Sequence, residues 1–263
     1  MTIFFFINSY NSFTPKKSLS EKILEIPPAE KIYLTNFYRY TFFLSSFGYT
    51  IFGSKPMSFD TVNLKHHLPI EEGADYMDIF HIFDRYKHKK CWKTWQRYSH
   101  LFSLKGFSFV SYEFPLSPDF VEVAIINHKN FLKTVAQHLT DFHEVLGLEL
   151  SPEAILQEYV KGQGEVFYKI RMHDGLFGTL LGFGRNNAWE FMDDSKRKSM
   201  QKFFPFSDPQ DSLHVLRPCF KVIRASKETN SLRKAYEKER LEIDKIYQQP
   251  DFLEQVLMKL ASG

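Results

Sequence analysis

Residues 106–126 read GFSFVSYEFPLSPDFVEVAII, and this stretch decides the class of the fold. Polar and apolar side chains alternate over residues 106–114, and β-branched residues are concentrated in residues 120–126, two patterns that are typical of strands. Pro115 and Pro118 lie between them, where proline suits a turn but not a central strand. The stretch therefore predicts two antiparallel strands joined by a turn.

Helical patterns lie on both sides of these strands. Apolar residues recur every three or four positions over residues 30–44, and residues 129–146 form a second helical stretch that Gly147 ends. A long charged helix follows Ser226 or Thr229. We expect an α+β fold that is predominantly helical, with helices covering one face of a small antiparallel sheet of about four strands.

Residues 48–62 predict the rest of that sheet. Residues 49–52 are β-branched and aromatic, residues 57–62 alternate, and the GSKP sequence at 53–56 has turn chemistry. We expect a hairpin that turns at this sequence. Residues 219–223 are expected to return to the sheet as a short strand.

The chain shows no linker, internal repeat or low-complexity segment. Residues 1–20 precede the first clear helical pattern and are expected to form a poorly ordered lead. Residues 21–263 are expected to fold as a single globular domain that ends in the charged helix and a short C-terminal helix, because a chain of this length can bury one large core.

The composition is that of an aromatic-rich globular protein. Hydrophobic residues make up 43% and charged residues 25% of the chain, with 28 Phe and 13 Tyr, so buried aromatic rings can stabilise the core without disulfides. The net charge of +3 is too balanced to indicate nucleic acid or an anionic membrane as partner. Cys91 and Cys219 are too few for a disulfide framework. A single bridge between them is compatible with the sequence, but we expect two buried, reduced thiols.

The first residues, MTIFFFI, are apolar, but no basic region precedes them and the run is shorter than a signal peptide requires. The apolar residues 40–52 are interrupted by Ser45, Ser46 and Gly48, so no membrane span is predicted. We expect a soluble, cytoplasmic protein, although export by a route without such a signal is compatible with the sequence.

The basic run at residues 85–98 is the segment most suggestive of nucleic-acid binding. On a helical wheel, however, Trp92 and Trp95 fall on one side, while Lys93 and Arg97 fall on the other with Lys89. This segregation indicates buried tryptophans beneath a solvated basic face, whereas base stacking needs exposed aromatic rings beside the cations. A protein partner is therefore favoured over nucleic acid.

Catalytic and metal-binding signatures are absent from the sequence. His138 and His143 are five residues apart instead of the four of an H-E-x-x-H helix, and neither a G-x-S-x-G elbow nor a P-loop occurs. We therefore predict no metal site and no cofactor, and we expect a binding or interaction module whose partner stays unknown.

One stretch, residues 173–191, is rich in glycine and predicts a site. Glycines inside a helix indicate either a close helix crossing or the approach of a ligand, and both interpretations stay open. His173, Arg185 and Asn186 are the candidate ligand-binding residues, with Arg185 as forked donor and Asn186 as the N-cap of a helix whose free amides hold a small anion. In the alternative function, an enzyme, Asp174 joins these three; in the purely structural interpretation, Arg185 pairs with a nearby acid such as Asp193 or Asp194.

Three stretches together resemble an uncharacterised paralogous protein family of chlamydia-like intracellular bacteria: FGYTIFGSKPMS at residues 47–58, LGFGRNNAW at 181–189 and SKET at 226–229. The likeness covers most of the chain. It implies an intracellular bacterium as source and a role at a host interface, but no activity, so it assigns no functional residue.

Overall fold

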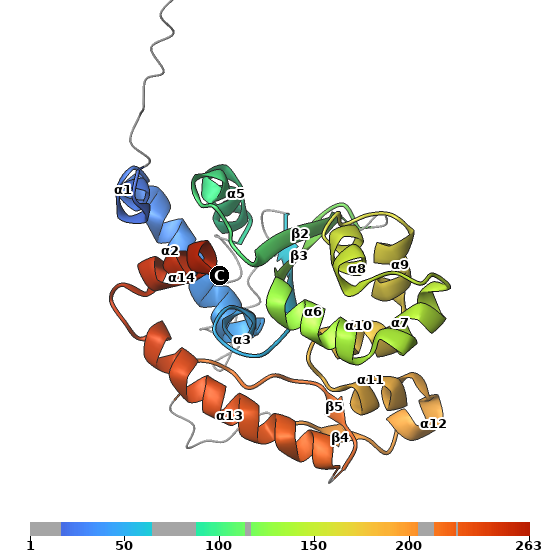
Figure 1. Ribbon diagram of the computed structural model, residues 1–263. Coiled ribbons are helices and arrows are strands. Elements are labelled where there is room, and N and C mark those ends of the chain that lie inside the picture. Colours follow the sequence, from blue (N-terminus) through green and yellow to red (C-terminus); the bar gives the residue numbers. More distant parts are fainter. Residues whose placement is uncertain (1–16, 65–87, 114–116, 205–212, 225) are drawn as a thin grey trace, which may run out of the picture.

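The structure, a computed structural model, describes residues 17–64, 88–113, 117–204, 213–224 and 226–263 (Figure 1). Helices predominate and pack on a small antiparallel sheet, so the predicted α+β class is confirmed. The strands are β1 (Met57–Asn63), β2 (Phe107–Glu113), β3 (Phe120–Asn127), β4 (Gln201–Lys202) and β5 (Lys221–Val222). The helices are α1 (Leu19–Leu24), α2 (Pro28–Leu44), α3 (Phe47–Ile51), α5 (His88–Tyr98), η1 (Ser99–Leu101), α6 (His128–Gln137), α7 (Leu139–Leu146), α8 (Pro152–Tyr159), α9 (Glu165–Met172), α10 (Asp174–Leu180), α11 (Arg185–Met192), α12 (Asp194–Arg197), α13 (Lys227–Tyr247) and α14 (Phe252–Ser262).

The main sheet has three strands in the order β1-β3-β2. The predicted pairing around the proline turn is confirmed, since β2 and β3 run antiparallel with Val110 opposite Ala124. β1 pairs with the other edge of β3, where Phe59 lies opposite Ala124. β4 and β5 form a separate two-stranded ladder, so the predicted strand at residues 219–223 exists but does not return to the main sheet.

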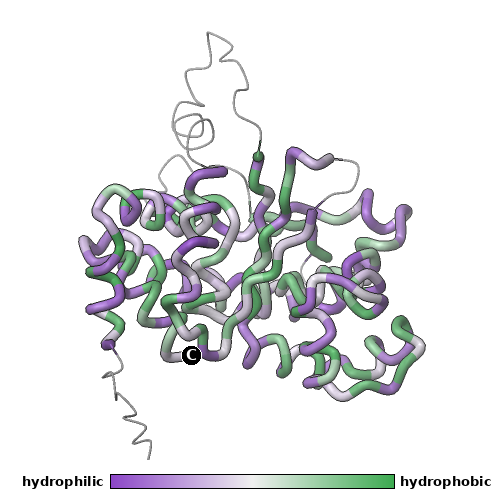
Figure 2. The backbone as a smooth tube through the Cα atoms, turned by 90° about the horizontal axis from the view of Figure 1, so that it is seen from above, coloured by the Kyte–Doolittle hydropathy of each residue, from purple (hydrophilic) through white to green (hydrophobic). Residues whose placement is uncertain are grey.

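Helices cover both faces of the sheet rather than the one face we expected. The central strand β3 is the reason, because its side chains are buried on both sides. Val121, Val123 and Ile125 belong to a first core, and Ile126 belongs to a second core, as the two-residue period of a strand requires. Figure 1 shows α2, α3, α5 and α14 on one side of the sheet and α6 to α10 on the other, and Figure 2 shows the same division from above.

The first core contains the two tryptophans of α5. Trp92 and Trp95 are 5% and 1% exposed, while Lys93 and Arg97 lie on the exposed side of the helix, so the predicted segregation is confirmed. Lys89 is half-buried instead of exposed. This aromatic side of α5 packs against α2, and the remainder of the basic run, residues 85–87, lies outside the described residues.

The predicted hairpin over residues 48–62 is wrong in its first half. Residues 57–62 are strand, but Phe47–Ile51 form helix α3, and β1 pairs with β3 instead. All five residues of α3 are buried, and a Cβ on Gly48 would lie 2.7 Å from Cγ2 of Ile243 in α13. A short element that is buried on every side has no polar face, so its apolar run resembles that of a strand.

The second core is closed by α6 to α10. Across it, Arg171 of α9 donates two hydrogen bonds to Glu122 of β3, at 3.1 and 2.6 Å. Glu122 is 5% exposed, and burial raises the pKa of its carboxyl group while Arg171 opposes that shift. A paired, forked contact of this kind is the condition under which a charge is tolerated in a core.

The helix starts follow local capping chemistry. Ser151 caps α8, Ser18 caps α1, and Ser226, one of the two starts predicted for the long charged helix, caps α13. The rest of the predicted lead, residues 1–16, lies outside the described residues. Within the described ranges, no helix combines the length and the apolar character that a membrane crossing needs.

Candidate functional site

The glycine-rich stretch at residues 173–191 forms two short helices. α10 ends before Gly182, whose φ of 73° turns the chain, and α11 returns alongside α10. A Cβ on Gly178 would lie 2.9 Å from the Cβ of Ala188, so the two helices approach too closely for a side chain there. Close helix packing therefore accounts for Gly178. We call residues 174–192 the α10–α11 hairpin.

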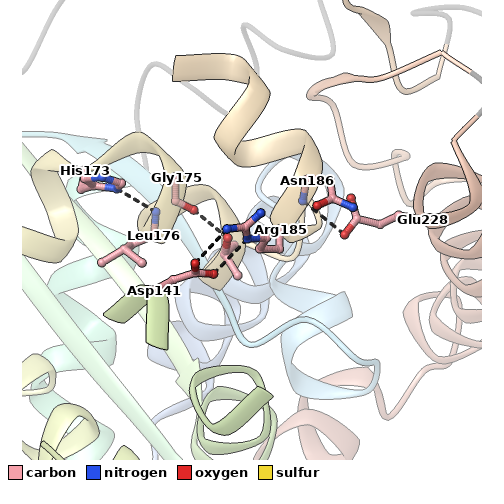
Figure 3. Close-up of polar contacts among 8 residues, drawn as sticks. Asp141, His173, Gly175, Leu176, Arg185, Asn186 and Glu228 are labelled. Atoms are coloured by element: carbon pink, nitrogen blue, oxygen red, sulfur yellow. Dashed lines mark hydrogen bonds and ion pairs between the residues drawn. The ribbon is translucent and has the colours of Figure 1, made fainter. Parts of the chain in front are cut away.

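His173 is the N-cap of α10. Its Nδ1 accepts the backbone N–H of Leu176 at 3.1 Å (Figure 3). Because Nδ1 is the acceptor, the neutral ring carries its proton on Nε2. The imidazole thus fixes the start of the hairpin, and one of its two nitrogens is already occupied.

Arg185 binds Asp141 of α7 rather than Asp193 or Asp194. Its Nε and Nη2 donate to the two carboxylate oxygens at 2.9 and 2.8 Å, the forked geometry of a strong arginine–carboxylate pair (Figure 3). The guanidinium holds the pKa of the Asp141 carboxyl below its usual range. Arg185 therefore links α11 to α7.

Trp189 brings two of the predicted residues together. The ring centroid of His173 lies 5.2 Å from that of Trp189, and the guanidinium carbon of Arg185 lies 4.8 Å from the indole centroid. The indole Nε1 is buried and has no hydrogen-bond partner among the residues that the structure describes. His173 and Arg185 thus both pack against the indole ring of Trp189, while Asn186 contacts α13.

Asn186 is the second residue of α11, and Gly184 occupies the N-cap position that we predicted for it. The backbone N–H of Asn186 donates to Glu228 of α13 at 3.3 Å (Figure 3). The backbone N–H of Asn187 donates to the same carboxylate, also at 3.3 Å. Gly184 leaves room for this contact, because a Cβ there would lie 2.7 Å from Cδ of Glu228. The amides that we expected to hold an external anion hold a carboxylate of the same chain.

Asn187 joins three segments of the chain. It is 1% exposed, and its Nδ2 donates to the carbonyl of Phe183 at 2.8 Å. Its Oδ1 accepts the backbone N–H of Ile223 at 2.9 Å and the hydroxyl of Thr229 at 3.2 Å. The amide thereby fastens the α10–α11 hairpin to the segment after β5 and to α13.

A polar cavity of about 340 Å³ lies between α6, the α10–α11 hairpin and α13. Arg185 lines it, whereas His173 and Asn186 are not among its described lining residues. Burial lowers the pKa of His138, which also faces it. Most of the lining side chains are polar. The complete lining consists of Ser54, Pro56, Asn130, Lys133, Thr134, Gln137, His138, Thr179, Gly182, Gly184, Arg185, Glu228, Ser231, Leu232 and Tyr236.

An apolar cavity, also of about 340 Å³, lies between the same hairpin and the β4–β5 ladder. Asp174, the fourth residue of the predicted enzyme site, lines it. Most of the lining belongs to the α10–α11 hairpin, and most of the lining side chains are aromatic or aliphatic. The complete lining consists of Asp174, Phe177, Gly178, Leu181, Phe183, Asn187, Ala188, Phe191, Lys202, Cys219, Phe220 and Lys221. The two cavities thus lie against the stretch in which the sequence predicted a site. No local pattern predicted that Lys202 and Lys221 would line the apolar cavity.

The thiols differ in exposure. Cys91 is buried, as expected, but Cys219 is exposed, so the prediction of two buried thiols is wrong. Around it, Pro218, Phe220 and Val222 are buried, which leaves Cys219 and Lys221 on the exposed side. This alternation of an extended segment places the thiol at the rim of the apolar cavity.

Lys55 was missed by sequence reasoning. It is 4% exposed, and its Nζ lies 5.6 Å from the centroid of the Phe183 ring. Burial lowers the pKa of its ammonium group to about 7, partly opposed by the charge of Glu239. No local signal marks Lys55, because its burial depends on α13 and on the turn after α10.

The described part of the chain contains no group of three or more His, Cys, Asp or Glu side chains that could hold a metal ion. A scan against known protein families, a search of curated proteins and a search of solved structures each found no match.

Proposed function

We propose that the protein is a binding module and that a small molecule in the apolar cavity is its ligand. The observation that carries this proposal is the cavity itself, whose volume of about 340 Å³ falls in the range of roughly 300–1,000 Å³ of small-molecule sites. Such sites are mostly apolar and aromatic with a few polar groups, which is the composition found between the hairpin and the β4–β5 ladder.

A broad protein-binding surface has less support. Among the described residues, the large exposed apolar side chains are spread over α1, α2, β3, α9, α11, α13 and α14 and over two loops instead of gathering on one element. Interaction surfaces for proteins usually show a contiguous apolar patch. We therefore narrow the expected interaction module to one that binds a small molecule.

The second candidate is an enzyme centred on His173, Asp174, Arg185 and Asn186. A catalytic group needs a lone pair or proton directed at the substrate. The Nδ1 of His173 caps α10, the guanidinium of Arg185 is paired with Asp141, and the backbone amide of Asn186 binds Glu228. These contacts favour structural roles, so we rank the enzyme second.

The proposal is tested with N-phenyl-1-naphthylamine, an uncharged dye whose fluorescence rises in apolar surroundings. Wild-type protein and the variant Cys219→Ser should bind the dye equally, since the hydroxyl keeps the shape of the thiol. Cys219→Trp should bind it at least about tenfold more weakly, because the indole fills the mouth of the cavity. Residue 219 is exposed, so both variants should keep the wild-type melting temperature. Equal binding by all three proteins, or no binding by wild type, would overturn the proposal.

A further inference from the structure

We infer that the polar cavity between α6, the α10–α11 hairpin and α13 is a second ligand site, and that its ligand is an uncharged, hydroxyl-rich molecule such as a monosaccharide. This inference goes beyond the proposed function, which concerns the apolar cavity. It is carried by half-buried polar groups on one face of α6 and by the charge balance of the lining.

One continuous polar face of α6 and its C-cap lines the cavity. Asn130, Thr134 and His138 follow one another at intervals of four residues, so they lie on the same side of the helix, and all three are half-buried. Lys133 and Gln137 lie beside them and are exposed. The first three residues therefore form the floor of the cavity, and the other two lie at its rim.

Thr134 differs from two buried threonines of other helices in how its hydroxyl is bonded. The hydroxyls of Thr41 and Thr179 donate to the backbone carbonyl four residues earlier, at 2.9 and 2.6 Å. Among the residues that the structure describes, the hydroxyl of Thr134 has neither this acceptor nor another hydrogen-bond partner. It is therefore available to a molecule in the cavity.

Asn130 and His138 offer further hydrogen-bonding groups. The Nδ2 of Asn130 donates to the carbonyls of Gly53 and Lys55 at 3.1 and 3.4 Å, which directs the amide nitrogen towards them and leaves Oδ1 as an acceptor. The ring of His138 has no hydrogen bond to any described residue, and a neutral imidazole has one donor and one acceptor. Sugar hydroxyls suit such a mixture, because each hydroxyl both donates and accepts.

The charges around the cavity are balanced, which favours an uncharged ligand. Lys133 and Arg185 are the cations of the described lining, and Glu228 is its acid. Asp141 binds Arg185 from outside the lining, so the two cations are matched by two carboxylates. Burial lowers the pKa of His138, which keeps its ring uncharged at neutral pH. A charged ligand would lose its hydration here without gaining an excess of opposite charge.

The size of the cavity suits one sugar ring. A cavity of roughly 150 Å³ accommodates benzene. The polar cavity, at about 340 Å³, is more than twice as large, so a six-membered ring with its hydroxyl groups has room in it. Leu232 and Pro56 also line the cavity and provide apolar surface for the C–H groups of the ring.

Saturation-transfer NMR with D-glucose, D-galactose, D-mannose, D-ribose and myo-inositol tests the inference. At least one of these probes should bind the wild-type protein. Ser231→Trp should weaken its binding at least about tenfold, because Ser231 is exposed in the lining and the indole fills the mouth of the cavity. Asn230→Trp is the matched control and should bind as wild type, since Asn230 is exposed at the preceding position of α13 and does not belong to the described lining.

Thr134→Val removes the hydroxyl of the floor and keeps the branched shape of the side chain. This variant should bind the same sugar about three- to tenfold more weakly, which is the effect of one lost hydrogen bond. Thr140→Val is its control, because Thr140 is exposed on α7 and lies outside the described lining. Equal affinities of these two variants would contradict the role assigned to Thr134.

No binding of any of the five probes, or equal binding by Ser231→Trp and Asn230→Trp, would overturn the second site. Tighter binding of D-gluconate or D-glucosamine than of D-glucose would overturn the uncharged ligand. The sugar should not displace N-phenyl-1-naphthylamine, and Cys219→Trp should bind it as wild type, because that residue lines the apolar cavity. Displacement of the dye by the sugar would place both molecules in the apolar cavity and overturn this inference, whereas failure of the dye alone would overturn only the proposed function.

Discussion

Lys55 carries its ammonium group into the protein interior, and its chemistry shows how one side chain can govern the response of the whole protein to pH. The amine faces the ring of Phe183, and Glu239 is the charged group that opposes the loss of its proton. Its pKa is about 7 in the folded protein, against an ordinary value of 10.5. Between these values the unfolded chain binds a proton that the folded chain has released, so the free energy of unfolding rises with pH.

We predict that Lys55→Met removes this rise. The variant should be more stable than wild type at pH 7, and the difference should shrink by up to about 1.4 kcal/mol for each pH unit above 7, since one proton is involved. Urea denaturation at pH 7, 8 and 9 measures it. Measurements end at pH 9 because Tyr236, whose pKa burial raises, acts in the opposite direction once the unfolded chain begins to ionise its tyrosines.

Lys234→Met is the control for this prediction, because Lys234 is exposed on α13. This control should follow the pH profile of wild type. If Lys55→Met also runs parallel to wild type from pH 7 to 9, then the ammonium group of Lys55 is not destabilised by burial.

At the scale of elements, the N-terminus of α11 is the part of the site for which the sequence-based prediction came closest, because free amides were predicted to bind an anion there. Its amides do bind an anion, but the anion is the carboxylate of Glu228. Removing a capping acceptor of this kind costs about 0.5–2 kcal/mol. We predict that Glu228→Ala loses this amount in urea denaturation and gains a sulfate-dependent stabilisation, because the freed amides and the helix dipole then bind the added anion.

Sulfate stabilises most folded proteins by exclusion from their surface, so the comparison is made against wild type at equal sulfate concentration. Glu228→Gln is the control, since its amide oxygen still accepts one hydrogen bond and fills the same space. It should show the response of wild type. A sulfate effect of equal size in wild type and in Glu228→Ala would contradict the prediction.

How far the sequence predicts an element depends on whether the element has two distinct faces. The segregated wheel of α5 was predicted correctly, because this helix has one buried and one exposed side. The strands at residues 57–62 and 106–114 were predicted from their alternation, although both strands contribute side chains to the first and to the second core. α3 was not, because all of its residues are buried. The predicted helix at 129–146 is also two helices, since the chain breaks at His138, which ends α6 and precedes α7.

The site was predictable only in part, for a similar reason. The glycines and His173, Arg185 and Asn186 were found because they lie within one short stretch. The acids that engage them, Asp141 and Glu228, lie more than 40 residues away along the chain, in α7 and α13. Local patterns carry no information about such pairing, which is why an external anion was predicted where the fold supplies its own carboxylates.

At the scale of the whole molecule, β3 contributes side chains to both cores, so neither core is complete without it. We predict that the two cores unfold together. The chain has three tryptophans, of which Trp92 and Trp95 report on the first core and Trp189 packs against the second. In Trp189→Phe, and in Trp92→Phe/Trp95→Phe, the fluorescence transition in urea should coincide with the far-UV circular dichroism of the same variant.

A fluorescence change of Trp189 at lower urea than the loss of helix would show that the second core opens separately. The single domain predicted for residues 21–263 would then be wrong. Coincident transitions in both variants would support the single domain. They would also mean that the residues lining the two cavities stay in place only while the whole domain is folded.

The pairing of Glu122 with Arg171 has a consequence for how the chain selects its register. β3 reads FVEVAIIN, and both of its faces are rich in apolar residues, so burial alone discriminates poorly between the native pairing and one shifted by a single position. A shift of one residue would turn Glu122 towards the first core, away from Arg171, and leave a buried carboxylate without its cation. The single acid of β3 thus selects the register, because it makes one of two nearly equivalent strand pairings far more costly than the other.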